Sequence, residues 1–211
     1  MKMQIVFGAL AAAMLVSFAL TVGCSTVPKN EQARNALQTD ADRTLDELKQ
    51  ADPSLSSVLD ESEGYAVFPS IGKGGLIVGG GYGRGTLYED GQMVGYTDMT
   101  QAALGALIGG QTFAELIVFD TPEALSNFKS GNFTFGATAN AVALDKGAAA
   151  ATSFKDGVAV FTRPNAGLMA EASLSGQKFS YVPLSEAGGP GEAELAAERQ
   201  EPTTQGAAPA P

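Results

Sequence analysis

The sequence predicts an α+β fold in which N-terminal helices pack on a strongly curved, mainly antiparallel β-sheet or small barrel, followed by a disordered C-terminal tail. Residues 31–50 repeat apolar side chains at three- and four-residue steps, as an amphipathic helix does. From Gly64 onward the chain changes to short β-type runs separated by glycines, and one further helix interrupts them. The lack of a lasting strand–helix alternation argues against a doubly wound parallel sheet.

Length and composition favour one globular domain with extensions. The chain has 211 residues, of which 45% are hydrophobic and 17% charged, so it can bury enough surface to offset chain entropy. It has no His, no Trp and one Cys, which argues against imidazole catalysis, Cys/His zinc sites and disulfides within the chain. A formal net charge of −10 argues against nucleic-acid binding, which needs clustered Lys and Arg. We expect no cofactor and no metal.

Residues 1–23 are predicted to be a lipoprotein signal peptide. Lys2 precedes an uncharged run from Ile5 to Val22, and Gly23 then precedes the only cysteine, Cys24. This ending resembles the bacterial lipobox, in which the cysteine is acylated and becomes the new N-terminus. More than one acyl chain gives stable attachment to a membrane. An uncleaved anchor is the alternative, because the uncharged run is long enough to span a bilayer.

The predicted location is the outer membrane of a bacterium, with the domain on the periplasmic face. Ser25 follows the cysteine, and by analogy with Gram-negative sorting a residue other than Asp here points to the outer membrane. Beyond the signal peptide, the negative charge lies mostly in the flanks. Residues 64–182 carry only −2, whereas 24–63 and 183–211 carry −5 and −4. The overall acidity therefore says little about what the folded surface binds.

Two helices are expected before the sheet. The apolar side of residues 31–50 consists of Ala33, Leu37, Ala41, Leu45 and Leu48. Acidic residues on the other side would be repelled by anionic headgroups, so packing on the domain core is favoured over lying on a membrane. Asp52-Pro53 then supplies an N-cap and a first-turn proline for a short helix that bears Leu55, Val58 and Leu59.

Short strands are expected to follow these helices. Asp90-Gly91 between two apolar runs predicts a hairpin that joins 86–88 to 93–96, and Thr121-Pro122 predicts the start of a helix that stops at Gly131. The remaining expected strands are 65–68, 76–78, 103–108, 113–119, 133–143, 157–162, 167–174 and 178–182, with turns at 165–167 and 175–177.

Glycines concentrate in residues 64–110, which hold 14 of the 26. The run fails as a P-loop, because Val67 stands where the first glycine is needed and Gly74 stands where Ser or Thr should follow Gly72-Lys73. It also opens no helix, as a dinucleotide fingerprint would. Two interpretations stay open. The glycines allow bulges and close backbone approach in a curved sheet. Alternatively, their exposed N–H groups bind an anionic headgroup together with the two nearby cations. The candidate headgroup site consists of Lys73, Gly72, Gly74, Gly75 and Arg84.

Three segments in order carry a family resemblance. Residues 64–80, which include Val67-Phe68-Pro69 and Lys73, resemble the opening of the SYLF domain. Residues 104–111 are similar to its second glycine segment, and 167–169 with 174–179 to its closing segment. The likeness covers about residues 36–182, which leaves 24–35 as a linker and 183–211 as the tail. It places Lys73 on the basic position after Val-Phe-Pro, whereas relatives often have an acidic residue near Arg84.

The resemblance implies a membrane-anchored, non-catalytic lipid-binding protein of the bacterial envelope that contacts anionic phospholipid headgroups. Eukaryotic relatives are associated with phosphoinositides, endocytic membranes and actin. In a periplasm we expect no actin binding, and phosphatidylglycerol, cardiolipin or lipid A in place of phosphoinositide-like headgroups. The alternative is an envelope scaffold lipoprotein that binds a protein partner through its tail or a sheet edge.

An enzyme is not expected. Without His, acid/base work would fall to other groups, for example Asp98 or Glu115, and no pair of carboxylates has a spacing that requires catalysis.

Overall fold

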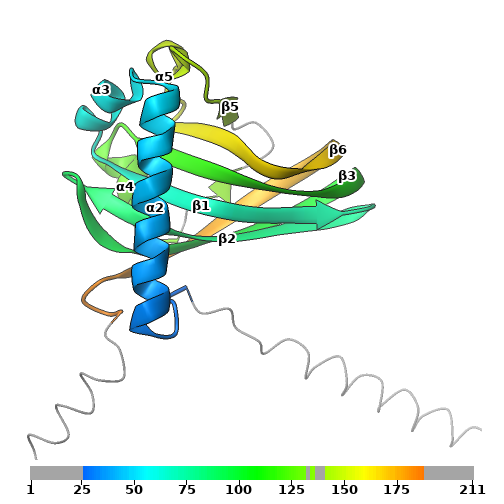
Figure 1. The fold of residues 1–211 in the computed structure, drawn as a ribbon, viewed down its shortest axis with the longest axis horizontal. Coiled ribbons are helices and arrows are strands. Elements are labelled where there is room, and N and C mark those ends of the chain that lie inside the picture. The colour runs from blue at the N-terminus through cyan, green and yellow to red at the C-terminus, as the bar shows by residue number, and fades with distance from the viewer. Residues whose placement is uncertain (1–25, 132–133, 136–140, 188–211) are drawn as a thin grey trace, which may run out of the picture.

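The computed structural model describes residues 26–131, 134–135 and 141–187, and in this part the chain has the predicted α+β fold (Figure 1). The sheet is mainly antiparallel and strongly curled, and it does not close into a barrel. The helices are α2 (Glu31–Ala51), α3 (Leu55–Asp60), α4 (Pro122–Lys129) and α5 (Ala148–Ala151). The strands are β1 (Gly64–Gly75), β2 (Val78–Glu89), β3 (Gln92–Phe119), β4 (Thr134–Phe135), β5 (Ala141–Ala143) and β6 (Val158–Pro183).

Helix α2 forms where the apolar periodicity predicts it. The Asn30 side chain accepts a hydrogen bond from the backbone N–H of Ala33 at 2.8 Å and so caps the helix. Ala41 and Leu48 are fully buried against the sheet. The Tyr88 hydroxyl of β2 also donates to the Asp42 carboxylate at 2.7 Å, which ties the helix to the sheet.

Asp52 has a different role from the predicted one, because α3 begins at Leu55 after Ser54. The Asp52 carboxylate is buried and accepts hydrogen bonds from the Ser54 backbone and hydroxyl at 3.0 and 2.7 Å, and from the backbone N–H of Ala149 at 2.8 Å. Burial alone would raise its pKa, but the hydrogen bonds from Ala149, Ser54 and Gly147 outweigh that effect and lower it to about 2. Asp52 therefore joins the start of α5 to the segment before α3.

Two hairpins frame β2. The Asp90-Gly91 turn is as predicted, with φ of 49° and 71°, the left-handed pair that a tight hairpin needs. The prediction of a strand over residues 76–78 is wrong for its first two members. Leu76 and Ile77 form the turn between β1 and β2, because Gly75 pairs with Gly79 and leaves no partners between them.

Strand β3 folds back on itself. Its first half runs antiparallel to β2 up to the pair Val78–Leu104, and its second half runs antiparallel to β1 from the pair Gly75–Gly109. Because β1 and β2 are themselves antiparallel, the two halves of β3 run in opposite directions. This reversal curls the sheet.

Strand β6 follows β3 along nearly its whole length, from Phe119–Val158 to Gly95–Pro183. The predicted turns at 165–167 and 175–177 are therefore wrong, since β6 continues through both. β3 supplies a partner for each residue of 175–177, whereas Asn165 is left out of the ladder at a register shift. The short strands β4 and β5 lie on β6, and the β5 pairing is parallel.

The sheet has a core on each face, as the alternation of side chains requires. On the α2 face, α2 and α3 cover Tyr65, Val67, Leu116, Val118 and Phe161. On the α4 face, Leu125 and Phe128 of α4 cover Phe68, Ile117 and Phe179. Thr121 caps α4 by accepting from Ala124 at 3.3 Å, and Gly131 follows the helix with a φ of 70°, as predicted.

The predicted signal peptide, Cys24 and the tail beyond Ala187 lie outside the described residues. The first described helix starts at Glu31, inside the stretch predicted as a linker. Near the other end, Ala187 is buried and its carbonyl accepts from the Arg34 guanidinium at 2.7 Å. In the described part of the chain, no helix has the length and apolarity to cross a membrane.

Candidate functional site

The first candidate site is the glycine-rich end of the sheet, made by residues 72–81 of the β1–β2 hairpin and residues 109–111 of β3. Glycines face each other across three strand segments here, in the pairs Gly75–Gly79, Gly74–Gly80 and Gly74–Gly110. The backbones approach so closely that a Cβ on Gly75 would overlap Gly79 and lie 2.7 Å from the Val78 carbonyl oxygen. Figure 1 shows this end projecting away from α2 and α3.

Three consecutive aliphatic side chains form the apex of this hairpin. Leu76, Ile77 and Val78 expose 70%, 78% and 67% of their surface. Among the side chains whose exposure the structure describes, which leave out residues 104–108, 134–135, 141–142 and 167–175, the only other large hydrophobic one that is exposed is Leu184, at 44%. The apex is therefore the most exposed apolar feature of the described surface.

The glycine-rich end also lacks acidic residues. In a chain with 23 Asp and Glu, none occurs between Glu63 and Glu89, and no charged residue occurs between Asp98 and Glu115. Lys73 and Arg84 are the only charged residues of the first stretch. The local charge of the hairpin is thus positive, opposite in sign to the chain as a whole.

The structure places the two cations on opposite faces of the sheet. Lys73 lies two residues beyond Ile71, a member of the α4-face core, and pairs with Gly81. Arg84 pairs with Ser70 and Asp98 on the α2 face, where its guanidinium lies 5.7 Å from the centre of the Tyr82 ring. One phosphate shared by both cations does not fit this placement. Of the predicted headgroup residues, Lys73 and the three glycines stay together, and Arg84 is separate.

A buried polar cluster lies on the α4 face beside the glycine-rich end. Gln101 is paired with both Gly81 and Gln177, and the Gln177 amide donates to the Glu115 carboxylate at 3.2 Å. Glu115 and Gln101 expose only 2% and 5% of their surface, and each has one side-chain oxygen without a hydrogen-bond partner in the part of the chain that the structure describes. The apolar core of this face therefore ends in a polar layer before the glycine-rich end begins.

Burial raises the pKa of Glu115 to about 7, because the charged form loses water. The Gln177 hydrogen bond and the positive charge of Lys73 act in the opposite direction and only partly offset this effect. Lys73 is therefore part of the hairpin, and its positive charge also acts to lower the pKa of the buried Glu115 carboxyl.

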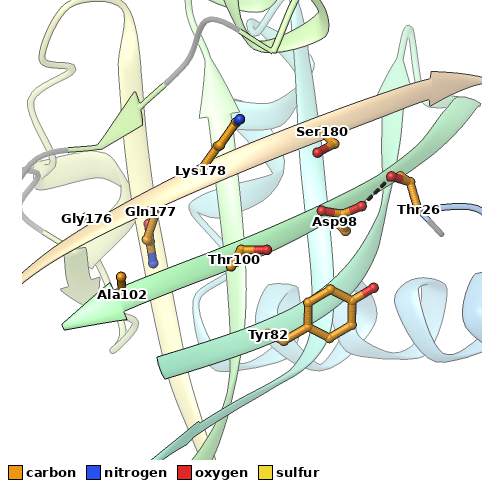
Figure 2. A pocket seen from close by; sticks show the side chains of 9 residues that line it. All are labelled: Thr26, Tyr82, Asp98, Thr100, Ala102, Gly176, Gln177, Lys178 and Ser180. Atoms are coloured by element: carbon orange, nitrogen blue, oxygen red, sulfur yellow. Dashed lines mark hydrogen bonds between the residues drawn. The ribbon is translucent and has the colours of Figure 1, made fainter. Parts of the chain in front are cut away.

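The second candidate is a groove of about 510 Å³ on the α2 face (Figure 2). It is lined by Thr26, Tyr82, Asp98, Thr100, Ala102, Gly176, Gln177, Lys178 and Ser180. The Thr26 hydroxyl donates to the Asp98 carboxylate across it. Asp98 is the one carboxylate in this lining, and Glu115 lies on the other face of the sheet. The two carboxylates that the sequence raised for catalysis are therefore not brought together.

Within residues 26–131, 134–135 and 141–187, no three acidic or sulfur side chains gather closely enough to hold a metal ion.

Comparison with known proteins finds a family match for part of the chain. Residues 100–182 match the Ysc84 family, which is described as "Las17-binding protein actin regulator" and contains the SYLF domain. The match with this SYLF family model covers 83 of the 211 residues. The matched range includes the second and closing segments on which the resemblance rested, and the opening segment with Lys73 precedes it.

Beta cell expansion factor A from Aeromonas veronii, which belongs to the SYLF family, is 29% identical to this chain over 151 residues. The alignment covers 71% of this chain and 57% of that protein. The chain thus spans little more than half the length of this SYLF relative.

Two features of the site were missed by sequence reasoning. The apex was assigned to a strand, although a pair of glycines on each side of Leu76–Val78 was the signal for a turn. The cluster of Gln101, Gln177 and Glu115 joins residues up to 76 positions apart, and only the strand register brings them together.

Proposed function

We propose that this SYLF chain is a membrane-anchored, non-catalytic protein of the bacterial envelope that binds anionic phospholipid headgroups through the glycine-rich end of its sheet. The observation that carries the proposal is the charge pattern. Residues 64–88, which form most of the β1–β2 hairpin, contain no carboxylate in a chain that has 23, and Lys73 lies near the turn of that hairpin. Such a patch attracts an anionic surface, while the rest of the molecule is repelled by it.

Lys73 is placed to make the ionic contact. It is half-buried and lies three residues before the apex, on the strand that leads into it. A Cβ on the neighbouring Gly72 would meet nothing within 4 Å, so the opposite face of β1 is open at this point.

The predicted acylation of Cys24 would complement this contact. A lipid anchor keeps the domain at the membrane, so a weak second contact acts at a high local concentration of headgroups. The lipid anchor then holds the domain at the membrane, and the glycine-rich end orients the domain on the membrane surface.

A vesicle-binding assay tests the proposal. We would use the chain from Ser25 onward, which contains every described helix and strand and both cores but lacks the predicted anchor. It should sediment with vesicles of phosphatidylcholine mixed with phosphatidylglycerol, and not with phosphatidylcholine alone. Lys73→Ala should weaken binding roughly fivefold, the equivalent of about 1 kcal/mol for one basic residue at an anionic surface.

Lys146→Ala is the matched control, because Lys146 is an exposed lysine next to α5 and not at the glycine-rich end. It should bind as the wild type does. Equal binding to both kinds of vesicle, or equal effects of the two substitutions, would refute the proposal. If vesicles are not bound and one envelope protein co-purifies in stoichiometric amount, the scaffold alternative replaces it.

A further inference from the structure

We infer that the hairpin apex, Leu76-Ile77-Val78, inserts into the apolar edge of a phospholipid bilayer. The inference rests on the proposed function and adds which side chains enter the membrane. Its first support is exposure. These three side chains keep at least two thirds of their surface in water, whereas the other aliphatic side chains of β1 and β2, such as Ile71 and Leu87, are fully buried.

The shape of the apex favours a bilayer over a protein partner. The apex is the three-residue segment enclosed by the pair Gly75–Gly79, so its side chains stand at the narrow end of a ribbon. A stable protein interface covers about 800 Å² on each partner, which three side chains flanked by glycines do not offer. A bilayer needs no such complementary area, because any aliphatic group that reaches its acyl region leaves water.

The spacing along β1 fits a membrane surface. Lys73 and Ile77 are four residues apart, which corresponds to about 13 Å along an extended strand. Peripheral segments bury their apolar side about 5–10 Å below the headgroups. An ammonium at the headgroup level thus allows the apex to reach the upper acyl chains. No carboxylate lies within ten residues of Ile77 on either side, so insertion buries no negative charge from this hairpin.

The backbone of the apex keeps the insertion shallow. Leu76 and Ile77 lie outside the β1–β2 ladder, so their N–H and C=O groups have no partners in that ladder. In the hydrocarbon centre such groups would be costly, whereas at the boundary water and headgroup oxygens can satisfy them. The apex therefore anchors the domain at the interface and does not span the bilayer.

The absence of Trp from the chain gives a direct test. In the chain from Ser25 onward, Ile77→Trp places a single fluorescent reporter at the apex. Gln92→Trp is the matched control, because Gln92 is exposed and lies at the opposite end of β2, just after the Asp90-Gly91 turn. With vesicles that contain phosphatidylglycerol, the I77W emission should move to shorter wavelength and be quenched by brominated acyl chains. The Q92W emission should not change.

Sedimentation of the same samples separates the two proposals. If the I77W protein sediments with vesicles but its emission stays that of exposed indole, the insertion is wrong and the proposed function stands. If neither variant nor the wild type sediments, the proposed function fails and the insertion with it. A shift without vesicles that grows with protein concentration would assign the apex to a contact between copies and overturn the inference. As a second measurement, Ile77→Ser should weaken vesicle binding about tenfold without lowering Tm, since the side chain is exposed.

Discussion

Glu115 links the polar cluster to the stability of the fold. Its carboxyl is buried, and its pKa is raised from 4.5 to about 7. The unfolded chain therefore loses this proton at a lower pH than the folded chain does. Between these two values the unfolded state binds fewer protons, so stability falls as the pH rises and stays lower above about pH 7.

Replacing this carboxyl should remove that pH dependence. Glu115→Gln keeps the shape of the protonated side chain and cannot ionise. Above about pH 7 it should raise the free energy of unfolding by about 3 kcal/mol, and below about pH 4.5 it should have little effect. Urea unfolding at both ends of this range measures the difference. Glu123→Gln, an exposed carboxyl on α4, is the control and should behave as the wild type does. An equal effect of Glu115→Gln at both ends would contradict the account.

The sequence shows Glu115 and Lys73 as charged residues but does not show that the two side chains lie close together. Both were visible as charged residues, and a carboxylate in a β-type run is usually a surface group. Its hydrogen-bond partner Gln177 is 62 positions away and pairs with Gln101 in the first half of β3, so the two side chains meet only because β3 folds back on itself. Contacts of this kind are set by strand pairing and not by local pattern.

At the scale of the elements, the β1–β2 ribbon owes its tight curvature to a few glycines. A Cβ on Gly85 would overlap the Val67 carbonyl oxygen and lie 2.9 Å from the Phe68 ring. A Cβ on Gly72, in the same ribbon, would meet nothing within 4 Å. The first glycine is thus required by packing, and the second is not.

Two alanine substitutions test this difference. Gly85→Ala should destabilise the protein by about 1–3 kcal/mol, because the backbone of β1 must move to make room. Gly72→Ala should change the free energy of unfolding by less than about 1 kcal/mol. Thermal unfolding followed by circular dichroism measures both. Similar losses for the two variants would contradict close packing as the reason that Gly85 is required.

Elements with local signals were predicted well, and elements that depend on partners were not. Helices α2 and α4 and the Asp90-Gly91 hairpin follow from periodicity, caps and turn residues. Asp52-Pro53 carries an equally good capping signal. The Asp52 carboxylate nevertheless accepts a hydrogen bond from the backbone N–H of Ala149, because α5 packs beside it. Strand β6 runs through Asn165 and Gly176, both turn-forming residues, since the long ladder with β3 outweighs their local preference.

At the scale of the whole molecule, positive and negative charge lie in different places. The glycine-rich end carries Lys73 and no carboxylate, whereas residues 188–211 carry a net charge of −3. The composition predicts that these tail residues are disordered. The disorder stays a prediction, because residues 188–211 lie outside the described part of the chain. Their charge would weaken attraction to an anionic membrane.

Deleting residues 188–211 tests whether the negative charge of the tail weakens binding to an anionic membrane. Both cores are formed by residues within 41–179, and the buried Ala187 would be kept, so Tm should stay within about 2 °C of the wild type. Affinity for vesicles that contain phosphatidylglycerol should rise, because repulsion is removed. A large fall in Tm would show that the tail packs on the domain, and an unchanged affinity would show that its charge does not act at the surface.

Hydrogen exchange of the chain from Ser25 onward, with and without vesicles that contain phosphatidylglycerol, tests the central claim most directly. The account predicts slower exchange of the amides in residues 72–81 when vesicles are present, and no change at the opposite hairpin, residues 88–94. Unchanged exchange in residues 72–81, or equal slowing at both ends of the sheet, would contradict it.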